Sequence, residues 1–215
     1  DGWALFQTCT NGASELMTNL SMSLVNMLYN LQLMAYAGEN GIAAYGVLMY
    51  VNMIFLAIFI GYSVGVAPVV GFHFGAKNHR ELHGLLRKSL LLIAATAVLM
   101  FAAGQALGEP LSRIFVGYDA GLLAITEHAF ALFSFSFLFC GFSIFGSSFF
   151  TALNDGLTSA LVSLLRTMVF QVAAVLLLPL LWGIDGVWLS IIVAEALSVA
   201  ATAVFLLVKR KRYGY

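Results

Sequence analysis

The sequence predicts an all-α integral membrane protein, a bundle of six transmembrane helices. Of its 215 residues, 61% are hydrophobic and only 9% are charged, whereas soluble domains carry about 25% charged residues. Apolar runs of about 20 residues, the length of helix that crosses the hydrocarbon layer, recur between short polar breaks. The sequence lacks the alternation of apolar and polar residues that is typical of membrane strands.

The six spans follow from these apolar runs and from the turns between them. Short turns rich in Gly, Asp and Asn lie at 38–41, 154–156 and 183–186, and short turns join antiparallel helices that pack together. By the length rule we place the spans, within one unit over 1–215, at about 14–36, 46–72, 89–108, 122–150, 157–182 and 186–208.

The basic residues predict the orientation, because Lys and Arg are retained on the cytoplasmic side of a membrane. They gather at 77–88, after the second span, and at 209–212, after the sixth. These two segments lie on one side if the spans alternate. We therefore expect a multi-pass protein of a cytoplasmic membrane, surrounded by the lipid bilayer, with its C-terminus in the cytoplasm.

Charge and cysteine content exclude several classes of protein. Ten basic and ten acidic residues cancel, so no overall field attracts nucleic acid. Cys9 and Cys140 lie in different segments and lack the spacing of a metal site, so we interpret both as packing residues. The chain begins at Asp1 and has no visible signal peptide, so we expect it to be part of a longer polypeptide.

A polar stripe distinguishes the first span. Its members are spaced by four, four, three and four residues and share one face of a helix: Glu15, Asn19, Ser23, Asn26 and Asn30. Such groups are costly in hydrocarbon, so the stripe faces partner helices or a water-filled cavity. It forms either a pathway for a substrate or ion, which we favour, or an interhelical contact.

Two acids are candidates for binding an ion or a proton. Glu15 could exchange a proton beside a cavity, or it could simply favour the N-terminus of its helix. Glu195 lies near the middle of the last span, at a depth where an acid needs a partner or a proton. Arg166 in the fifth span is its possible charge partner, although it could instead extend to the membrane surface.

Prolines, glycines and phenylalanines suggest further structural roles. Pro68 and Pro179 lie inside predicted spans, where a missing backbone donor loosens a helix and can create a hinge. Glycine pairs four residues apart, such as 104 and 108, allow helices to approach closely. The nine phenylalanines of the fourth span are interpreted as packing or lipid-facing residues.

Histidines 73, 79 and 83 are the basis of an enzymatic alternative. His79 and His83 share a helical face, as ligands of a metal enzyme would. Three or four ligands are needed, however, and neighbouring Lys and Arg disfavour a bound cation. We therefore expect a solvated loop, no catalytic residue and no metal site.

Four segments resemble the C-terminal half of multidrug and toxic compound extrusion (MATE) transporters. They occur in order along the chain and read NGASELMTNLS (11–21), APVVGFHFGAKNHRELHGLLRKS (67–89), FFTALNDGLTSALVSLLR (149–166) and LPLLWGIDGVWLSIIVAE (178–195). The resemblance implies one six-helix lobe of a twelve-helix, two-lobe transporter, whose N-terminal lobe is absent from this chain. It implies export of small organic cations or amphiphiles from bacteria by antiport with H⁺ or Na⁺, without another cofactor.

The resemblance also bears on the site residues. Some members bind the coupling cation at an acid in the first helix of this half, and Glu15 is the acid available here. Others place that acid where Ser23 lies and use an Asp in the fourth helix, where this span has none. A related flippase for lipid-linked sugars is the nearest alternative, but it would need several basic residues for pyrophosphate. A structural membrane subunit is a further alternative.

Overall fold

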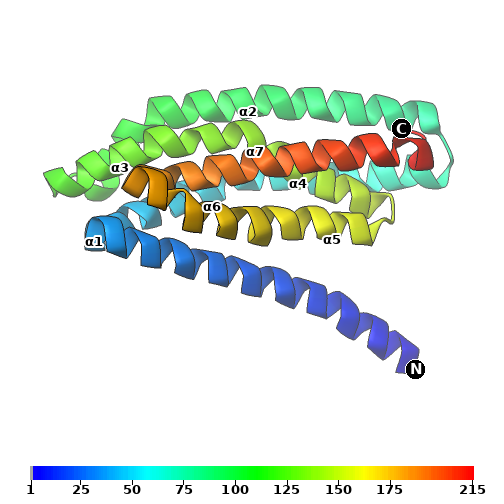
Figure 1. Ribbon diagram of the computed structural model, residues 1–215. Coiled ribbons are helices and arrows are strands. Elements are labelled where there is room, and N and C mark those ends of the chain that lie inside the picture. Colours follow the sequence, from blue (N-terminus) through cyan, green and yellow to red (C-terminus); the bar gives the residue numbers. More distant parts are fainter. Residues whose placement is uncertain (1) are drawn as a thin grey trace.

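The computed structural model describes the side chains of residues 20–215, and its helix assignment begins at residue 2. In the described residues every regular element is helical, which confirms the predicted all-α class. The elements are α1 (Gly2–Gly75), α2 (His79–Val116), α3 (Ala120–Phe133), the 3₁₀ turn η1 (Ser134–Ser136), α4 (Phe137–Ala152), α5 (Gly156–Leu164), the π-helical η2 (Leu165–Phe170), α6 (Gln171–Leu177) and α7 (Pro179–Tyr213). They run lengthwise along one elongated bundle (Figure 1).

Two of these elements are folded at a glycine. Gly38 (φ 64°, ψ −152°) divides α1, which runs along the bundle and returns (Figure 1). Gly183 (φ 57°, ψ −132°) divides α7 in the same way. Both conformations favour a residue without a Cβ, and both breaks fall in turns that the sequence predicts. Pro68 lies within α1 and Pro179 begins α7, and their roles as hinges stay a prediction.

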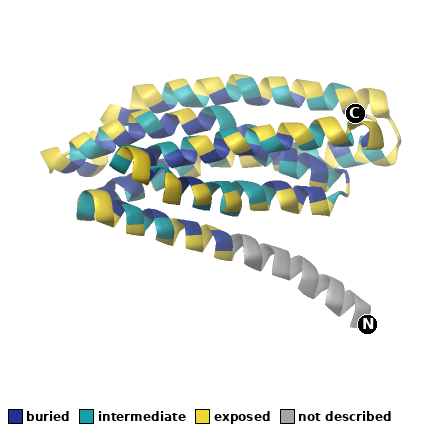
Figure 2. Cartoon of the chain, viewed as in Figure 1, coloured by how far each residue is buried: buried dark blue, intermediate teal, exposed yellow. Residues whose placement is uncertain are grey.

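Length and composition qualify five described helices to cross a membrane, the first of them the 56-residue segment Leu20–Gly75 that Gly38 folds in two. Large apolar side chains on the outside of the bundle support this, among them Leu180, Leu181 and Leu207, each more than 70% exposed. Such side chains match a lipid surrounding rather than water. Figure 2 shows exposed residues along the outer helix faces and buried ones between helices.

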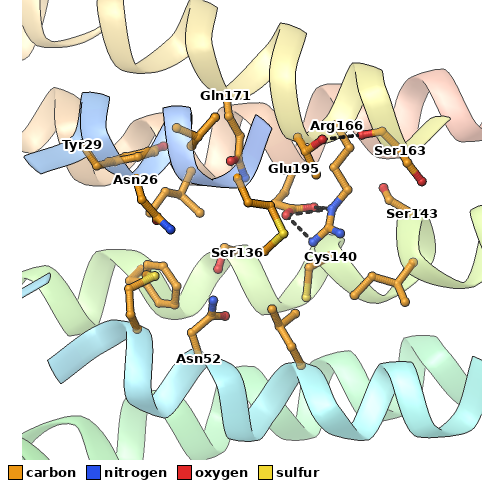
Figure 3. Close-up of a pocket in the computed structure, with 18 of the residues that line it drawn as sticks. Asn26, Tyr29, Asn52, Ser136, Cys140, Ser143, Ser163, Arg166, Gln171 and Glu195 are labelled. Atoms are coloured by element: carbon orange, nitrogen blue, oxygen red, sulfur yellow. Dashed lines mark hydrogen bonds and ion pairs between the residues drawn. The ribbon is translucent and has the colours of Figure 1, made fainter. Parts of the chain in front are cut away.

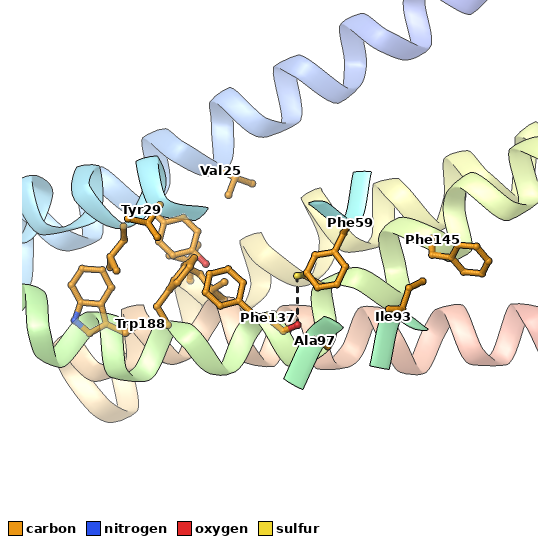
Figure 4. Close-up of a cluster of buried hydrophobic side chains, with 14 of the residues drawn as sticks. Val25, Tyr29, Phe59, Ile93, Ala97, Phe137, Phe145 and Trp188 are labelled. Carbon is orange, nitrogen blue, oxygen red and sulfur yellow. Dashed lines mark hydrogen bonds between the residues drawn. The ribbon is translucent and has the colours of Figure 1, made fainter. Parts of the chain in front are cut away.

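Aromatic side chains dominate the interior. Phe130, Phe133, Phe137, Phe145 and Phe149 from α3 and α4 are at most 2% exposed. Phe59 and Trp188 join them from α1 and α7 (Figure 4). Most phenylalanines of the predicted fourth span therefore fill space between helices rather than face lipid.

Close helix contacts occur at glycines. A Cβ at Gly104 or Gly108 would lie within about 3 Å of Ser134 or Phe130, so this pair lets α2 approach η1 and α3. A Cβ at Gly146 would collide with the Thr202 methyl group, so α4 and α7 are in direct contact there.

The C-terminal end of the chain ties several elements together. The Tyr213 hydroxyl donates to Asp155 Oδ2 at 2.7 Å, and Lys209 Nζ lies 3.3 Å from the same oxygen. Asp155 also caps α5 through Thr158, and the Tyr213 carbonyl lies 3.2 Å from His79 Nδ1. We call Asp155, Thr158, Lys209 and Tyr213 the C-terminal clasp.

Candidate functional site

A cavity of about 380 Å³ lies inside the bundle, between both arms of α1 and the segments from α3 to α7. Its wall is largely apolar, with polar groups from several elements (Figure 3). The polar and ionisable side chains that line it are Asn26, Tyr29, Tyr45, Asn52, Ser136, Cys140, Ser143, Ser147, Ser163, Arg166, Thr167, Gln171 and Glu195. A mostly apolar pocket with a few converging polar groups is typical of a ligand site.

An ion pair between Arg166 and Glu195 lies at the wall of this cavity. Arg166 Nε donates to Oε1 and Oε2 of Glu195 at 3.0 and 2.9 Å, and Nη2 donates to Oε1 at 2.7 Å. The side chains are 17% and 4% exposed. Both carboxylate oxygens are therefore engaged by one guanidinium, the strongest kind of charge-assisted contact.

Local helix geometry accounts for the meeting of these charges. Arg166 belongs to the π-helical turn η2, and such turns widen a helix by one residue and are frequent at functional sites. Glu195 lies 12 residues after the Gly183 break, or about 18 Å along the helix at 1.5 Å per residue. The pair is thus deep in the bundle, where ionised groups require partners.

Aromatic and amide groups form the α1 side of the cavity. Tyr29 and Tyr45 stack with their ring centroids 5.4 Å apart. The Tyr45 hydroxyl donates to Asn26 Oδ1 at 3.0 Å, and the Tyr29 hydroxyl lies 2.8 Å from Ser190 Oγ. These contacts fix two flat aromatic faces next to the cavity, and such faces attract organic cations.

The structure separates the members of the predicted stripe. Glu15 and Asn19 lie outside the residues whose side chains are described. Asn26 lines the cavity, whereas Ser23 is exposed and Asn30 is half-buried, and neither belongs to the cavity wall. In the described part of the chain, the stripe thus contributes one residue to the site.

Sequence reasoning missed a face of small polar side chains that runs from η1 into α4. Ser136, Cys140, Ser143 and Ser147 line the cavity, and their spacing of four, three and four residues places them on one helical face. That spacing is a detectable signal, but the phenylalanines between these residues obscured it. Asn52 and Gln171 were also missed, because each is the single carboxamide of its predicted span.

The three histidines of the enzymatic alternative do not come together around one site. His83 is exposed, His73 packs edge-on against Phe72, and His79 contacts the Tyr213 carbonyl. Among residues 20–215, no three His, Cys, Asp or Glu side chains are grouped as a metal site requires. Cys140 is buried beside the cavity, whereas Cys9 lies outside the described side chains.

A helical bundle with apolar outer faces and several helices long enough to cross a membrane defines the class of this chain, that of multi-span α-helical membrane proteins. Residues 16–177 match the MatE family model, and the chain belongs to this family.

Relatives and solved structures agree with this family. The chain is 21% identical to the multidrug export protein MepA of Staphylococcus aureus (strain bovine RF122 / ET3-1), over 94% of this chain and 44% of MepA. It resembles an outward-facing multidrug resistance MATE family transporter of the MOP superfamily (TM-score 0.83, 20% identity, 94% of this chain and 45% of that one). It also resembles a mutant of the Vibrio cholerae MATE transporter VcmN (TM-score 0.85, 17% identity, 93% and 45%).

The chain therefore spans a little under half the length of these relatives. They are an export protein and transporters, not enzymes, so the family gives no support to the enzymatic alternative. Their shared fold confirms the resemblance to MATE transporters that the sequence motifs predict.

Proposed function

We propose that this chain forms one lobe of an alternating-access antiporter, which exports organic cations or amphiphiles across a bacterial plasma membrane. The partner is a second, N-terminal lobe of the same transporter, and the basic ends at 77–88 and 209–212 face the cytoplasm. The observation that carries this proposal is the Arg166–Glu195 pair beside a cavity with aromatic walls. Rocking of the two lobes opens the site to one side of the membrane at a time.

The Arg166–Glu195 pair couples the proton to the organic cation, because the cavity does not hold both at the same time. While Glu195 is ionised, it neutralises Arg166, and the cavity can accept a cation. When Glu195 takes up a proton, the free guanidinium repels that cation. Two unit charges about 6 Å apart repel by about 3 kcal/mol at an effective dielectric constant of about 20, equivalent to roughly a hundredfold in affinity.

Of the two coupling ions expected, we favour the proton. Both oxygens of Glu195 already accept hydrogen bonds from Arg166. Na⁺ would have to displace the guanidinium and remain beside its positive charge, whereas a proton neutralises the carboxylate directly. Glu15 and Asn19 retain their proposed roles in coupling and in lining the cleft, together with Ser23, Asn26 and Asn30.

The flippase alternative is weaker because of the same pair. A pyrophosphate group needs unpaired basic side chains. Arg166 is the basic residue of this cavity wall, and its charge is neutralised by Glu195.

Efflux of a fluorescent organic cation tests the proposal, in vesicles of the complete transporter of which this chain forms one half. We expect an imposed proton gradient to drive efflux in the wild type and to fail in Glu195→Gln. Glu109→Gln is the matched control, because it changes an Arg–Glu pair that is exposed, and its efflux stays normal. Unchanged efflux in Glu195→Gln would place the coupling elsewhere, and wild-type efflux driven by Na⁺ alone would contradict proton coupling.

A further inference from the structure

A chain of hydroxyl groups runs between α4 and α5, from the cavity to the end of the bundle that carries the C-terminus. Ser163 Oγ lies 2.9 Å from Ser147 Oγ, and Ser147 Oγ lies 2.9 Å from Ser159 Oγ. Ser159 Oγ in turn lies 2.7 Å from Thr151 Oγ1. All of these distances are within hydrogen-bonding range.

One end of this row of hydroxyls lies at the cavity, and the other lies at the protein surface. Ser147 and Ser163 line the cavity together with Arg166 and Glu195. Ser159 is only 9% exposed, whereas Thr151 is on the surface. The hydroxyls therefore connect the inside of the lobe with its surface, next to the α4–α5 turn.

Three of these hydroxyls, those of Ser147, Ser159 and Ser163, differ from others in the bundle, whereas Thr151 Oγ1 also donates to the Ser147 carbonyl at 3.1 Å, and Ser147 Oγ also lies 3.3 Å from the Ser159 carbonyl. A hydroxyl in a membrane helix commonly donates its hydrogen bond to the carbonyl four residues earlier, as those of Ser63, Ser112 and Thr126 do. The Oγ atoms of Ser147, Ser159 and Ser163 instead contact each other across two helices. Helix stability alone does not require this arrangement.

We propose that this row of hydroxyl groups is a proton route between Glu195 and the water at the predicted cytoplasmic end of the lobe. The proposal rests on the proposed function of Glu195 as the coupling acid. Each hydroxyl can donate one hydrogen bond while it accepts another. As each one receives a proton and passes on its own, Glu195 loses one proton, the water at Thr151 gains one, and every hydroxyl stays neutral.

The cavity has the room and the polar groups to hold a water that would complete the inner end of the route. Ser143 lies one turn from Ser147 on the same face of α4, and its buried hydroxyl has no hydrogen-bond partner among the described residues. A buried water needs polar partners and room, and the cavity supplies both between Glu195 and Ser163.

Among residues 20–215, the ionisable groups that face Glu195 are Arg166 from η2, Cys140 from α4 and Tyr29 from α1. Asp155, Lys209 and Tyr213 lie beyond the outer end, in the C-terminal clasp. The route gives the proton an exit to the cytoplasm, and coupled antiport requires that it conducts only while the cleft between the lobes is closed to the other side.

A sided pH jump tests the route without measuring transport. The complete transporter is reconstituted in vesicles with its C-terminal end facing the bath, and the bath is acidified. The infrared band of the protonated Glu195 carboxyl, identified by its loss in Glu195→Gln, is followed over time. We expect protonation to be about tenfold slower in Ser159→Ala and in Thr151→Val than in the wild type.

In two control variants we expect Glu195 to be protonated at the wild-type rate. Ser159→Thr retains the hydroxyl, and Ser112→Ala removes a buried serine hydroxyl outside the route. A wild-type rate in both Ser159→Ala and Thr151→Val would overturn the route and leave antiport untouched. A Glu195 carboxyl that never takes up a proton in the wild type would overturn the coupling role and the route together. The infrared measurement gives both results even in variants that do not transport.

Discussion

Arg166 and Glu195 neutralise each other's charge in the interior of the bundle. The contribution of either residue to the stability of the fold therefore depends on the presence of the other. Removing one member of a buried pair leaves an uncompensated charge and costs about 3–5 kcal/mol, whereas replacing both by apolar residues is often nearly neutral. We expect Arg166→Met and Glu195→Met each to destabilise the transporter by this amount, and the double variant to be more stable than either single one. Denaturant unfolding in detergent measures this cycle.

The exposed pair of Arg113 and Glu109 is the control for that cycle. Its side chains are 65% and 62% exposed, so the same replacements should cost no more than about 1 kcal/mol. Additive costs at Arg166 and Glu195 would mean that the two residues do not compensate each other.

Asp155 makes the C-terminal clasp sensitive to acid. Burial raises the pKa of its carboxyl, but hydrogen bonds from Tyr213, Thr158 and Lys209 outweigh this effect and lower the pKa from 3.8 to about 2. A lowered pKa in the folded state means that the ionised carboxylate stabilises the fold fully above pH 3.8, and that this contribution is lost as the pH falls through 2.

Thermal unfolding at a series of pH values checks this behaviour. Asp155→Asn should lower the unfolding midpoint at pH 5, and its difference from the wild type should shrink between pH 4 and pH 2. Asp119→Asn is the control, because asparagine can still accept the hydrogen bonds that cap α3. A difference that stays constant down to pH 2 would show that the Asp155 carboxylate contributes nothing to the fold.

At the scale of elements, the contact between α4 and α7 depends on the absence of a side chain at Gly146. A Cβ there meets the Thr202 methyl group, and overpacking typically costs about 1–3 kcal/mol. We expect Gly146→Ala to destabilise the protein by this amount and the added change Thr202→Ala to restore most of the loss. Gly61→Ala, where the Cβ meets open space, should be neutral. A neutral Gly146→Ala, measured by denaturant unfolding, would contradict this packing.

Local signals predicted the elements better than they predicted the site. The turns around Gly38, Asp155 and Gly183 carry glycine and capping residues, and the structure breaks or caps its helices at each of them. The approach of Arg166 to Glu195 depends on a π-helical turn in one segment and on the packing of another, 29 residues apart. Only the depth of each charge is visible in the sequence, so their pairing could be suggested but not established.

The same reasoning explains why part of the candidate site was missed. Asn26 belongs to a periodic stripe and was therefore detected, whereas Asn52 and Gln171 are each the single carboxamide of their predicted span, and whether such a residue lines a cavity depends on tertiary packing. The stripe itself could not distinguish a cavity wall from an exposed face, since helical spacing shows which residues share a face but not what that face meets. Ser23 is exposed on this lobe and lies outside the cavity wall, and its place in the proposed cleft stays a prediction.

At the scale of the whole molecule, the proposed antiport reduces to competition between one proton and one organic cation for the cavity at Glu195. Such competition has a thermodynamic signature that requires no transport, because the affinity for the cation must depend on the protonation of the acid. In the proposed transporter the second lobe would contribute groups of its own, but a change at Glu195 isolates the contribution of this chain.

The most direct test is the Kd of the complete transporter for a fluorescent organic cation, measured as a function of pH in detergent. We expect the wild-type Kd to be constant at high pH and to rise, by up to about a hundredfold, as the pH falls and Glu195 takes up its proton. In Glu195→Gln this dependence should disappear, while Glu109→Gln should follow the wild type. A wild-type Kd that does not change with pH, or a slope that survives in Glu195→Gln, would contradict the assignment of Glu195 as the coupling acid.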